Sequence, residues 1–321
     1  MRIKYLSFGK FKTGGYRHET ILYDSLVKYL SKNHSVKAEK LRLHRYFENP
    51  IAYLKLLWWA FKNADADINV VTSRLAIPAM IKNSRNNKQV WIVLHNYDPN
   101  DGKSEWMKLY YKWLFKRLKN TNHSRFKIIT VSPFWKQYFK EEIGITNTYI
   151  FPNLFDVKYY RKLATQEKNP WIHLGQLSSK NDPEIYKLAE ELVKDGYYCY
   201  FSTLDANEVR QNGNFGIIKF DTFKDYLEQM AKCCCTLALT EVNEGWNRLA
   251  HESILVGTPV IGYDKGGLGD LLRESNSLVV RNIEEAYTCI REALWVLPDE
   301  SFYEHYSLTA SDHFIEQICN Q

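Results

Sequence analysis

Apolar residues in the first half of the chain occur in short runs, separated by longer segments in which every third or fourth residue is apolar. The short runs are rich in Val, Ile and aromatic residues, which is typical of strands buried on both faces of a sheet. The longer segments have the spacing of amphipathic helices, as in the set Leu22, Leu26 and Leu30. The predicted strands are residues 3–8, 36–41, 68–72, 90–94, 128–131 and 149–151.

The second half of the chain repeats this alternation of strand-like and helix-like segments. Such an alternation favours a parallel sheet with right-handed crossovers. A polar stretch that predicts no strand, residues 157–170, separates the two halves. The predicted strands of the second half are residues 171–174, 197–201, 217–220, 236–239, 259–262 and 278–280, and its predicted helices include residues 223–230, 247–256 and 284–294.

These elements predict an α/β protein with two Rossmann-like domains that face each other across a cleft. The N-terminal domain covers residues 1–156, and the C-terminal domain covers residues 157–300. A last amphipathic segment lies within residues 301–321, and we expect it to pack back on the N-terminal domain. Rossmann-like domains bind ligands at the carboxyl ends of their strands, so chemistry is expected in the loops that follow the strands.

The composition predicts a soluble protein of a reducing compartment. Apolar residues make up 45% and charged residues 25% of the 321 positions. No uncharged apolar run approaches the ~20 residues of a membrane span, and the first residues are too charged for a signal peptide. The run Cys233-Cys234-Cys235 has neither disulfide nor metal-ligand spacing, so we expect buried thiols at a strand entrance. A cytoplasmic location follows.

Charge is divided unequally between the two halves. Residues 1–156 contain 27 Lys and Arg against 12 Asp and Glu, whereas the remainder contains 16 against 25. This asymmetry indicates two domains with different partners. One helix-like segment of the basic half has lysines beside tryptophans, namely Lys108, Lys112 and Lys116 beside Trp106 and Trp113. Such helices bind anionic membranes, here the inner membrane face, although a solvated lysine face is the alternative.

Two glutamates follow the predicted strand 236–239. Glu244 lies in the loop after the strand, and Glu252 lies eight residues further on, about two turns into the predicted helix. At this spacing the two carboxylates can meet different parts of one extended ligand. Ionised carboxylates accept strong hydrogen bonds from sugar and ribose hydroxyls. A helix with a solvated acidic face gives the same pattern, so the pair alone does not decide the function.

The surrounding residues favour the functional interpretation. Residues 241–272 resemble the signature of retaining glycosyltransferases of family 4, which have two Rossmann-like domains in the GT-B fold. In that family an E-x7-E motif precedes a Gly-Thr-Pro-Val turn and a Gly-Gly loop, which are here Glu244 with Glu252 and, after the turn, Gly266 with Gly267. The resemblance implies that Glu244 contacts the donor sugar and Glu252 the ribose. It also implies that the backbone near Gly266 and Gly267 approaches the donor.

Two features of the N-terminal half fit the same resemblance. Gly14 and Gly15 lie between the first predicted strand and a helix, where glycine permits close backbone approach and a helix N-terminus attracts anions. His95 and Asn96 follow the predicted strand 90–94. The resemblance places the glycines beside the donor diphosphate and His95 close to the donor sugar. Taken alone, the same residues also fit a tight turn and a structural histidine.

The diphosphate site departs from the family pattern. Family members carry Gly-Arg-Leu and then a lysine after the first strand of the second domain, whereas this chain has Gly175-Gln176-Leu177 and then Lys180. With neutral Gln176 in place of the arginine, the protein lacks one fixed positive charge beside the leaving group. Negative charge grows on that leaving group in the transition state. Arg248, inside the E-x7-E motif, either compensates for this loss or is a solvated helix residue.

The pair Asp65 and Asp67 looks like a metal-binding D-x-D motif but precedes its predicted strand instead of following it. We therefore interpret the pair as solvated residues at a strand entrance and expect no metal site. No cofactor is expected besides the nucleoside-diphosphate sugar, which would be the donor substrate. No recognition motif for nucleic acid accompanies the basic charge.

The sequence thus predicts a metal-independent retaining glycosyltransferase that moves a sugar from a nucleoside-diphosphate sugar to a hydroxyl acceptor, which is lipid-linked, a glycan or a protein. Two alternatives stay open. One is an inactive nucleotide-sugar-binding or membrane-adaptor protein, and the other is a sugar-nucleotide epimerase of similar fold. The predicted catalytic residues are Glu244 and His95, and the predicted donor-binding residues are Gly14, Gly15, Lys180, Arg248, Glu252, Gly266 and Gly267.

Overall fold

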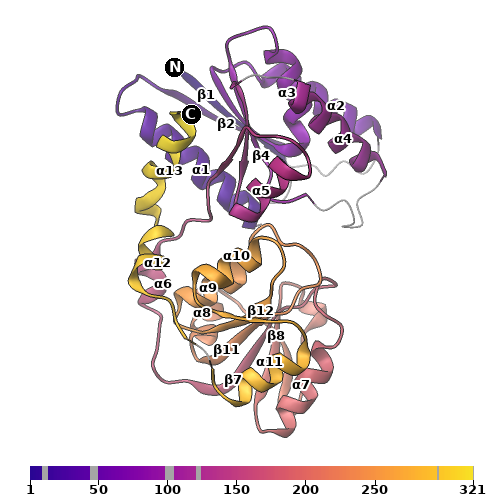
Figure 1. Cartoon of the computed structure of the whole chain (residues 1–321), viewed down its shortest axis with the longest axis vertical. Helices are drawn as coiled ribbons and strands as arrows, with labels where there is room; N and C mark the ends of the chain where they lie inside the picture. Colours follow the sequence, from indigo (N-terminus) through magenta and orange to yellow (C-terminus); the bar gives the residue numbers. More distant parts are fainter. Residues whose placement is uncertain (9–13, 44–49, 98–104, 121–123, 295, 321) are drawn as a thin grey trace. The chain divides into compact units, whose positions relative to one another are not determined.

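The computed structural model describes residues 1–8, 14–43, 50–97, 105–120, 124–294 and 296–320. The chain divides into two compact units, each built on its own sheet (Figure 1). Unit 1 contains Met1–Leu154 and Thr309–Gln321, and unit 2 contains Phe155–Leu308. Two α/β units with largely parallel sheets confirm the predicted fold class.

Unit 1 is built on a six-stranded parallel sheet in the order β2-β1-β3-β4-β5-β6. Neighbouring residues of a strand enter different cores because side chains alternate between the two faces of a sheet. On β3, for example, Val70 packs in one core and Val71 in the other. The strands are β1 (Arg2–Phe8), β2 (Lys37–Leu43), β3 (Ile68–Thr72), β4 (Gln89–Val93), β5 (Phe126–Thr130) and β6 (Thr148–Ile150).

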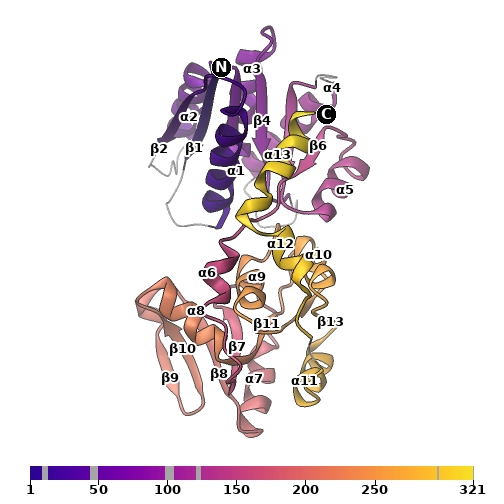
Figure 2. The same cartoon turned by 90° about the vertical axis from the view of Figure 1, so that its left-hand side faces the viewer.

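Helices cover both faces of this sheet. α1 and α13, from opposite ends of the chain, lie side by side on one face, where Leu26 and Ile315 are fully buried in a shared core (Figure 2). The other core contains side chains of α2, α3, α4 and α5. The helices are α1 (Gly14–Leu30), α2 (Pro50–Asn63), α3 (Ala76–Asn83), which follows the 3-10 turn η1 (Ser73–Leu75), α4 (Glu105–Asn120), α5 (Pro133–Glu141) and α13 (Ser311–Cys319).

Unit 2 is built on a seven-stranded sheet in the order β13-β12-β11-β7-β8-β10-β9. All its strands pair in parallel except the edge strand β9, which is antiparallel to β10. The sequence does not predict β9 because all three of its residues are polar and exposed. The strands are β7 (Asn169–Gln176), β8 (Tyr198–Thr203), β9 (Arg210–Asn212), β10 (Phe215–Lys219), β11 (Cys233–Ala238), β12 (Val260–Tyr263) and β13 (Leu278–Val280).

The helices of unit 2 follow its strands in the predicted alternation. α7 and α11 contribute to a core on one face of the sheet, in which Leu188 and Ile290 are buried. Cys233 and Cys235 are buried at the start of β11, and all six cysteines are free thiols, which confirms the interpretation of the cysteine run. The helices are α6 (Val157–Arg161), α7 (Ile185–Lys194), α8 (Phe223–Ala231), α9 (Arg248–Leu255), α10 (Gly267–Glu274), α11 (Ile283–Arg291) and α12 (Glu300–His305).

The amphipathic segment at the end of the chain consists of two helices instead of one. α12 belongs to unit 2, whereas α13 belongs to unit 1. Between them Ser307 forms a parallel bridge with Phe155, and the backbone N–H of Phe155 donates to the carbonyl of Tyr306 at 2.9 Å. The sequence pattern gives no sign of this break, because apolar residues on both sides of it are buried: Tyr306 in unit 2 and Phe314 in unit 1.

Candidate functional site

The loop between β11 and α9 in unit 2 carries Glu244. The side chain of Asn247 ends this loop by accepting a hydrogen bond from the backbone N–H of Ala250 at 2.9 Å. An asparagine cap of this kind satisfies a backbone donor that the first turn of a helix leaves without a partner. The cap therefore determines where α9 begins and where Glu252 lies on it.

A second loop, between β12 and α10, is joined to the Glu244 loop through the backbone. Glu244 and Gly266 form a parallel bridge, and the N–H of Gly267 donates to the carbonyl of Glu244 at 2.8 Å. Gly266 has a φ of +59°, and a Cβ at this position would lie 2.6 Å from the carbonyl oxygen of Glu244. Only glycine accommodates this approach. The structure thus brings together Glu244, Gly266 and Gly267 at the carboxyl ends of β11 and β12.

Glu252 and Arg248 form a buried ion pair on α9. Nε of Arg248 donates to Oε1 of Glu252 at 2.9 Å, and the two side chains are 17% and 7% exposed, respectively. The guanidinium lies 4.3 Å from the centre of the Phe155 ring, and the hydroxyl of Tyr160 donates to Oε1 of Glu252 at 3.5 Å. Nη1 of Arg248 is buried and has no hydrogen-bond partner among the described residues. Arg248 is therefore a largely buried, ion-paired cation whose Nη1 is an unused donor, and the alternative of a solvated helix residue is wrong.

Two titratable side chains beside this pair are held neutral. Burial raises the pKa of the Tyr226 hydroxyl well above its usual value, and the carboxylate of Glu252 raises it further. Burial lowers the pKa of His251 well below its usual value, and the positive charge of Arg248 lowers it further. Nδ1 of the neutral His251 accepts a hydrogen bond from Nε1 of Trp246 at 3.0 Å. Trp246 and His251 therefore hold the Glu244 loop against α9.

The loop after β7 brings a lysine to the same place. Nζ of Lys180 lies 3.6 Å from Oε1 of Glu244. The backbone N–H of Glu241 donates to the carbonyl of Lys180 at 2.9 Å, and the side-chain amide of Asn181 donates to the carbonyl of Gln176 at 2.9 Å. The first of these bonds ties the loops after β7 and β11 together, and the second closes the loop after β7 on itself. Lys180 thus lies beside Glu244, and neutral Gln176 lies at the end of β7.

In unit 1, His95 follows β4 and belongs to a cluster of polar side chains that are largely buried. Nε2 of His95 lies 3.4 Å from Oε1 of Glu19 on α1, and Glu19 also accepts a hydrogen bond from the hydroxyl of Tyr5 on β1. The His18 ring packs edge-on against the His95 ring with 4.8 Å between ring centres, and Nε2 of His18 lies 2.6 Å from the carbonyl oxygen of Phe151. These contacts fix the orientation of the His95 ring.

Gly15 lies against the same histidine. A Cβ at Gly15 would lie 3.3 Å from Nε2 of His95, a separation that few side chains adopt. Gly14 is the first residue of α1, and residues 9–13 of the predicted glycine loop lie outside the described residues. The structure therefore brings together Gly15 and His95, which are 80 residues apart in the sequence.

Glu19 and Tyr5 are members of this cluster that the sequence analysis missed. Burial raises the pKa of the Tyr5 hydroxyl far above its usual value, and the neighbouring Glu19 carboxylate raises it further, so the hydroxyl stays protonated and donates. A single glutamate in the second turn of a helix usually faces solvent. The sequence contains one sign of a polar site on β1. Tyr5 and Ser7 alternate with apolar residues, which places both side chains on one face of the strand.

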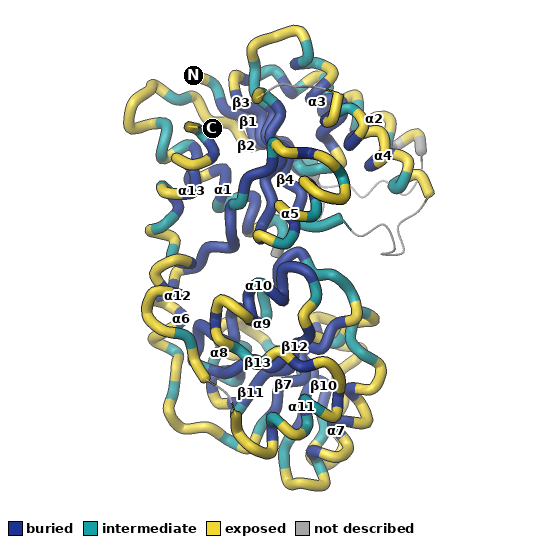
Figure 3. The backbone as a smooth tube through the Cα atoms, viewed as in Figure 1, coloured by how far each residue is buried: buried dark blue, intermediate teal, exposed yellow. Residues whose placement is uncertain are grey.

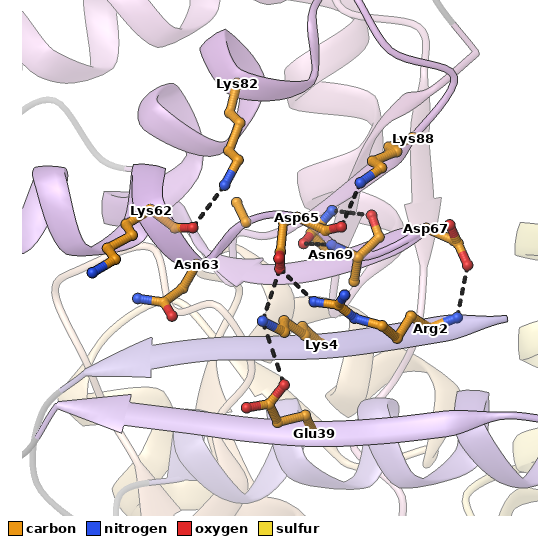
Figure 4. A network of polar contacts seen from close by, with 12 residues as sticks. Arg2, Lys4, Glu39, Lys62, Asn63, Asp65, Asp67, Asn69, Lys82 and Lys88 are labelled. Carbon is orange, nitrogen blue, oxygen red and sulfur yellow. Dashed lines mark hydrogen bonds and ion pairs between the residues drawn. The ribbon is translucent and has the colours of Figure 1, made fainter.

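Asp65 and Asp67 lie at the other end of the unit 1 strands and are bound by basic residues (Figure 4). Oδ1 of Asp65 lies 2.8 Å from Nη2 of Arg2 and 2.7 Å from Nζ of Lys4, and the backbone N–H of Arg2 donates to Asp67 at 2.7 Å. Partial burial alone would raise the pKa of Asp65, but the hydrogen bonds from Lys4 and Arg2 outweigh it and lower the pKa to about 2. Asp65 is thus ion-paired rather than simply solvated, whereas Asp67 is exposed, and both carboxylates tie β1 to the segment before β3.

No known family model and no curated protein sequence matches this chain. Solved structures do resemble it over its whole length. HepE of Anabaena in complex with UDP matches with a TM-score of 0.71 and 15% identity, covering 100% of both chains. WaaG, a glycosyltransferase involved in lipopolysaccharide biosynthesis, matches with a TM-score of 0.62 and 13% identity, covering 98% of this chain and 95% of WaaG.

A structure with a different activity also matches. The UDP-GlcNAc 2-epimerase of Methanocaldococcus jannaschii has a TM-score of 0.58 and 12% identity, and the match covers 100% of both chains. At these identities the comparisons establish the fold, which is the GT-B fold of two Rossmann-like domains. A transferase and an epimerase share it, so the choice between these activities depends on the residues of the site.

Proposed function

We propose that this protein is a glycosyltransferase that moves a sugar from a nucleoside-diphosphate sugar to a hydroxyl acceptor with retention of the anomeric configuration. The observation that carries the proposal is the junction of the Glu244 and Gly266 loops beside the buried Arg248–Glu252 pair. This arrangement offers two carboxylates for hydroxyl groups and a cation for a phosphate. Further support comes from HepE, which shares the fold and has been crystallised with UDP-glucose.

Each residue of the unit 2 site takes one part of the donor in this proposal. Glu252 accepts hydrogen bonds from the ribose hydroxyls, and Glu244 accepts them from the sugar, because charged acceptors bind hydroxyls strongly. Nη1 of Arg248 donates to the diphosphate and so replaces the positive charge that Gln176 does not supply. The other groups proposed for the diphosphate are Lys180 and the backbone near Gly14, Gly15 and Gly266, whereas the N–H of Gly267 is bonded to the carbonyl of Glu244 and holds the loop in place.

The proposed reaction needs no dedicated base. The acceptor oxygen forms a bond to the anomeric carbon on the face from which the diphosphate leaves, and the bond from that carbon to the phosphate oxygen breaks. The departing phosphate oxygen takes the proton of the acceptor hydroxyl. The protein positions the reactants and stabilises the charge that develops on the leaving group. His95, oriented by Glu19, contacts the sugar, and the cations Lys180 and Arg248 act in place of a metal.

A nucleotide-binding experiment tests the proposal first. We expect one nucleoside diphosphate, with UDP as the first candidate, to raise the melting temperature of the protein, because binding stabilises the native state by roughly 2.7 kcal/mol at a hundredfold excess over Kd. The stabilisation should weaken in Glu252→Gln and persist in Glu190→Ala, a change at an exposed residue of α7. If no nucleoside diphosphate stabilises the protein, the proposed donor site is wrong.

Product analysis separates the proposal from its two alternatives. A transferase releases nucleoside diphosphate slowly with water and faster with an acceptor, and it does so in excess EDTA. An inactive binding protein, the alternative suggested by Gln176, binds the nucleotide but releases no product. An epimerase, the alternative suggested by the shared fold, converts the donor sugar without an acceptor and without net transfer. Nuclear magnetic resonance of the product's anomeric proton tests retention.

A further inference from the structure

Two helices of unit 1, α2 and α4, expose large apolar side chains in matching rows. Each row has the spacing i, i+3 and i+7, which places its members along one face of a helix. All six side chains are between 49% and 76% exposed, and Figure 3 shows exposed stretches along both helices. The rows are Ile51, Leu54 and Trp58 on α2, and Trp106, Leu109 and Trp113 on α4.

The opposite faces of both helices already fill the core of unit 1. Leu56 and Leu114, for example, are completely or almost completely buried. The two helices contribute to the same core, and they are linked through side chains: the rings of Tyr53 on α2 and Tyr110 on α4 lie 6.3 Å apart, and the hydroxyl of Tyr110 donates to the carbonyl of Ser73 at 2.9 Å. The exposed rows therefore belong to helices that cover the same face of the sheet, and they are additional to the core-forming residues.

Basic residues accompany these apolar rows. α2 and α4 together contain six lysines and one arginine against a single acid, Glu105. Lys112 and Lys116 are exposed beside Trp113, whereas Lys108 is paired with Glu105 at 2.7 Å and contributes less net charge. Unit 1 as a whole contains 27 Lys and Arg against 13 Asp and Glu. The face formed by these two helices is thus both apolar and strongly positive.

We propose that this α2–α4 face binds the surface of an anionic lipid bilayer. Tryptophan and aliphatic side chains partition into the interface between headgroups and acyl chains, and lysines at that depth attract anionic headgroups. A second copy of the chain fits less well, because two faces of the same positive charge repel each other. No helix among the described residues is long and apolar enough to cross a membrane. The attachment is therefore peripheral and reversible.

The α2–α4 face is connected to the His95 cluster by direct packing. Tyr97, two residues after His95, contacts the rings of Tyr111 and Phe115 on the inner side of α4, with 5.0 Å and 4.8 Å between ring centres. If the protein has the function proposed above, this contact favours an acceptor attached to a membrane lipid over a soluble glycan or a protein. Binding of the bilayer itself does not depend on that function.

Vesicle co-sedimentation of the full chain tests the surface. We expect binding to vesicles of phosphatidylcholine with phosphatidylglycerol and much weaker binding to phosphatidylcholine alone. Raising the ionic strength from about 0.1 M to about 1 M shortens the Debye length from about 10 Å to about 3 Å and should release most of the protein. Two sets of substitutions should each lower binding about tenfold or more, namely Trp58→Ser with Trp106→Ser and Trp113→Ser, and Lys55→Gln with Lys112→Gln and Lys116→Gln.

Matched substitutions elsewhere control for general surface effects. Leu204→Ser with Val209→Ser removes exposed apolar side chains of unit 2, and Lys136→Gln with Lys140→Gln removes exposed charges of α5. Both controls should bind anionic vesicles like the unchanged protein, and all variants should keep the melting temperature and the nucleoside diphosphate response. Failure of the unchanged protein to bind anionic vesicles at low salt would refute the proposed membrane-binding role of the α2–α4 face. It would leave the proposed donor site unaffected. Sedimentation velocity gives a second test. A dimer that the tryptophan substitutions dissociate would refute the proposal, because the face would then bind a second copy of the chain.

Discussion

The two units build their candidate sites in different ways. In unit 2 all the key residues except Lys180 lie within 24 positions of one another, from Glu244 to Gly267, and a backbone hydrogen bond and an ion pair on one helix hold them. In unit 1 the cluster contains residues of three separate elements, with Tyr5 on β1, Glu19 on α1 and His95 after β4. The unit 2 site is largely local in the sequence, whereas the unit 1 cluster is assembled only by tertiary packing.

This difference explains which residues a sequence motif can identify. Capping, helical spacing and a glycine that must have positive φ are local rules, so they hold a local site in place whatever surrounds it. A carboxylate that contacts a histidine from another element obeys no local rule. We therefore expect substitutions in unit 2 to damage both folding and donor binding, and substitutions in the unit 1 cluster to affect turnover with little effect on folding.

The largest effect is expected for Glu252→Ala. Removing one member of a buried ion pair leaves Arg248 without its partner and should lower the free energy of unfolding by roughly 3–5 kcal/mol. Donor binding should weaken by roughly 1.5–3 kcal/mol because a charged acceptor for hydroxyls is lost. Urea denaturation and calorimetry measure the two effects. Glu252→Gln keeps the shape and one acceptor oxygen but removes the charge, so a Glu252→Gln variant that behaves like the unchanged protein would argue against a role of the charge.

Gly266→Ala tests whether the junction of the two unit 2 loops is needed. The new Cβ would approach the carbonyl of Glu244 to 2.6 Å, so the loops must separate. We expect a loss of roughly 1–3 kcal/mol in unfolding free energy and a weaker nucleotide response. Gly213→Ala is the matched control, because Gly213 also has positive φ, at +55°, but no atom within 4 Å of its Cβ position. Equal behaviour of the two variants would mean that only backbone conformation matters.

Acid sensitivity should also separate the two units. His173 of unit 2 is fully buried, and burial lowers its pKa to about 3. Because the folded pKa lies below the unfolded value of about 6.5, the unfolded chain binds the proton first. The stability that this neutral histidine contributes is present above pH 6.5 and is lost as the pH falls toward 3.

Substitution of this histidine measures its share of the acid response. Between pH 6.5 and 5 the unchanged protein should lose about 1.4 kcal/mol per pH unit more than His173→Gln does, as followed by urea denaturation. Asp65 of unit 1 should respond only at lower pH, because its pKa is lowered to about 2 and its contribution is lost as the pH falls below its usual value. Identical pH profiles of the unchanged protein and the variant would refute this assignment.

The smallest effect is expected for Glu19→Gln in the unit 1 cluster. The amide can still accept the hydrogen bond from Tyr5 but removes the charge beside His95. We expect a decrease of about tenfold in kcat, equivalent to about 1.4 kcal/mol, with little change in donor binding or unfolding free energy. Glu141→Gln, at an exposed position of α5, should leave kcat unchanged. A variant with unchanged kcat would show that Glu19 does not act through His95.

The α/β fold with two Rossmann-like domains was predictable from the sequence alone, because buried parallel strands and amphipathic helices leave separate periodicities in the chain. The positions of most strands were also predictable to within a few residues, for example β3 at Ile68–Thr72. Glu244, Glu252 and Gly266 were identifiable because their contacts are fixed by loop length and helical spacing. The polar strand β9 left no periodicity, and it exists because β10 supplies its hydrogen bonds.

The environment of each charged side chain, in contrast, was visible only in the folded protein. A lysine or arginine in an amphipathic helix has the same sequence pattern whether it faces solvent or a partner, and the structure buries Arg248 against Phe155 but leaves Lys112 exposed. Likewise, Glu19 became part of the His95 cluster because α1 packs against β1. Burial and charge pairing depend on which elements meet, and that depends on contacts between residues far apart in the chain.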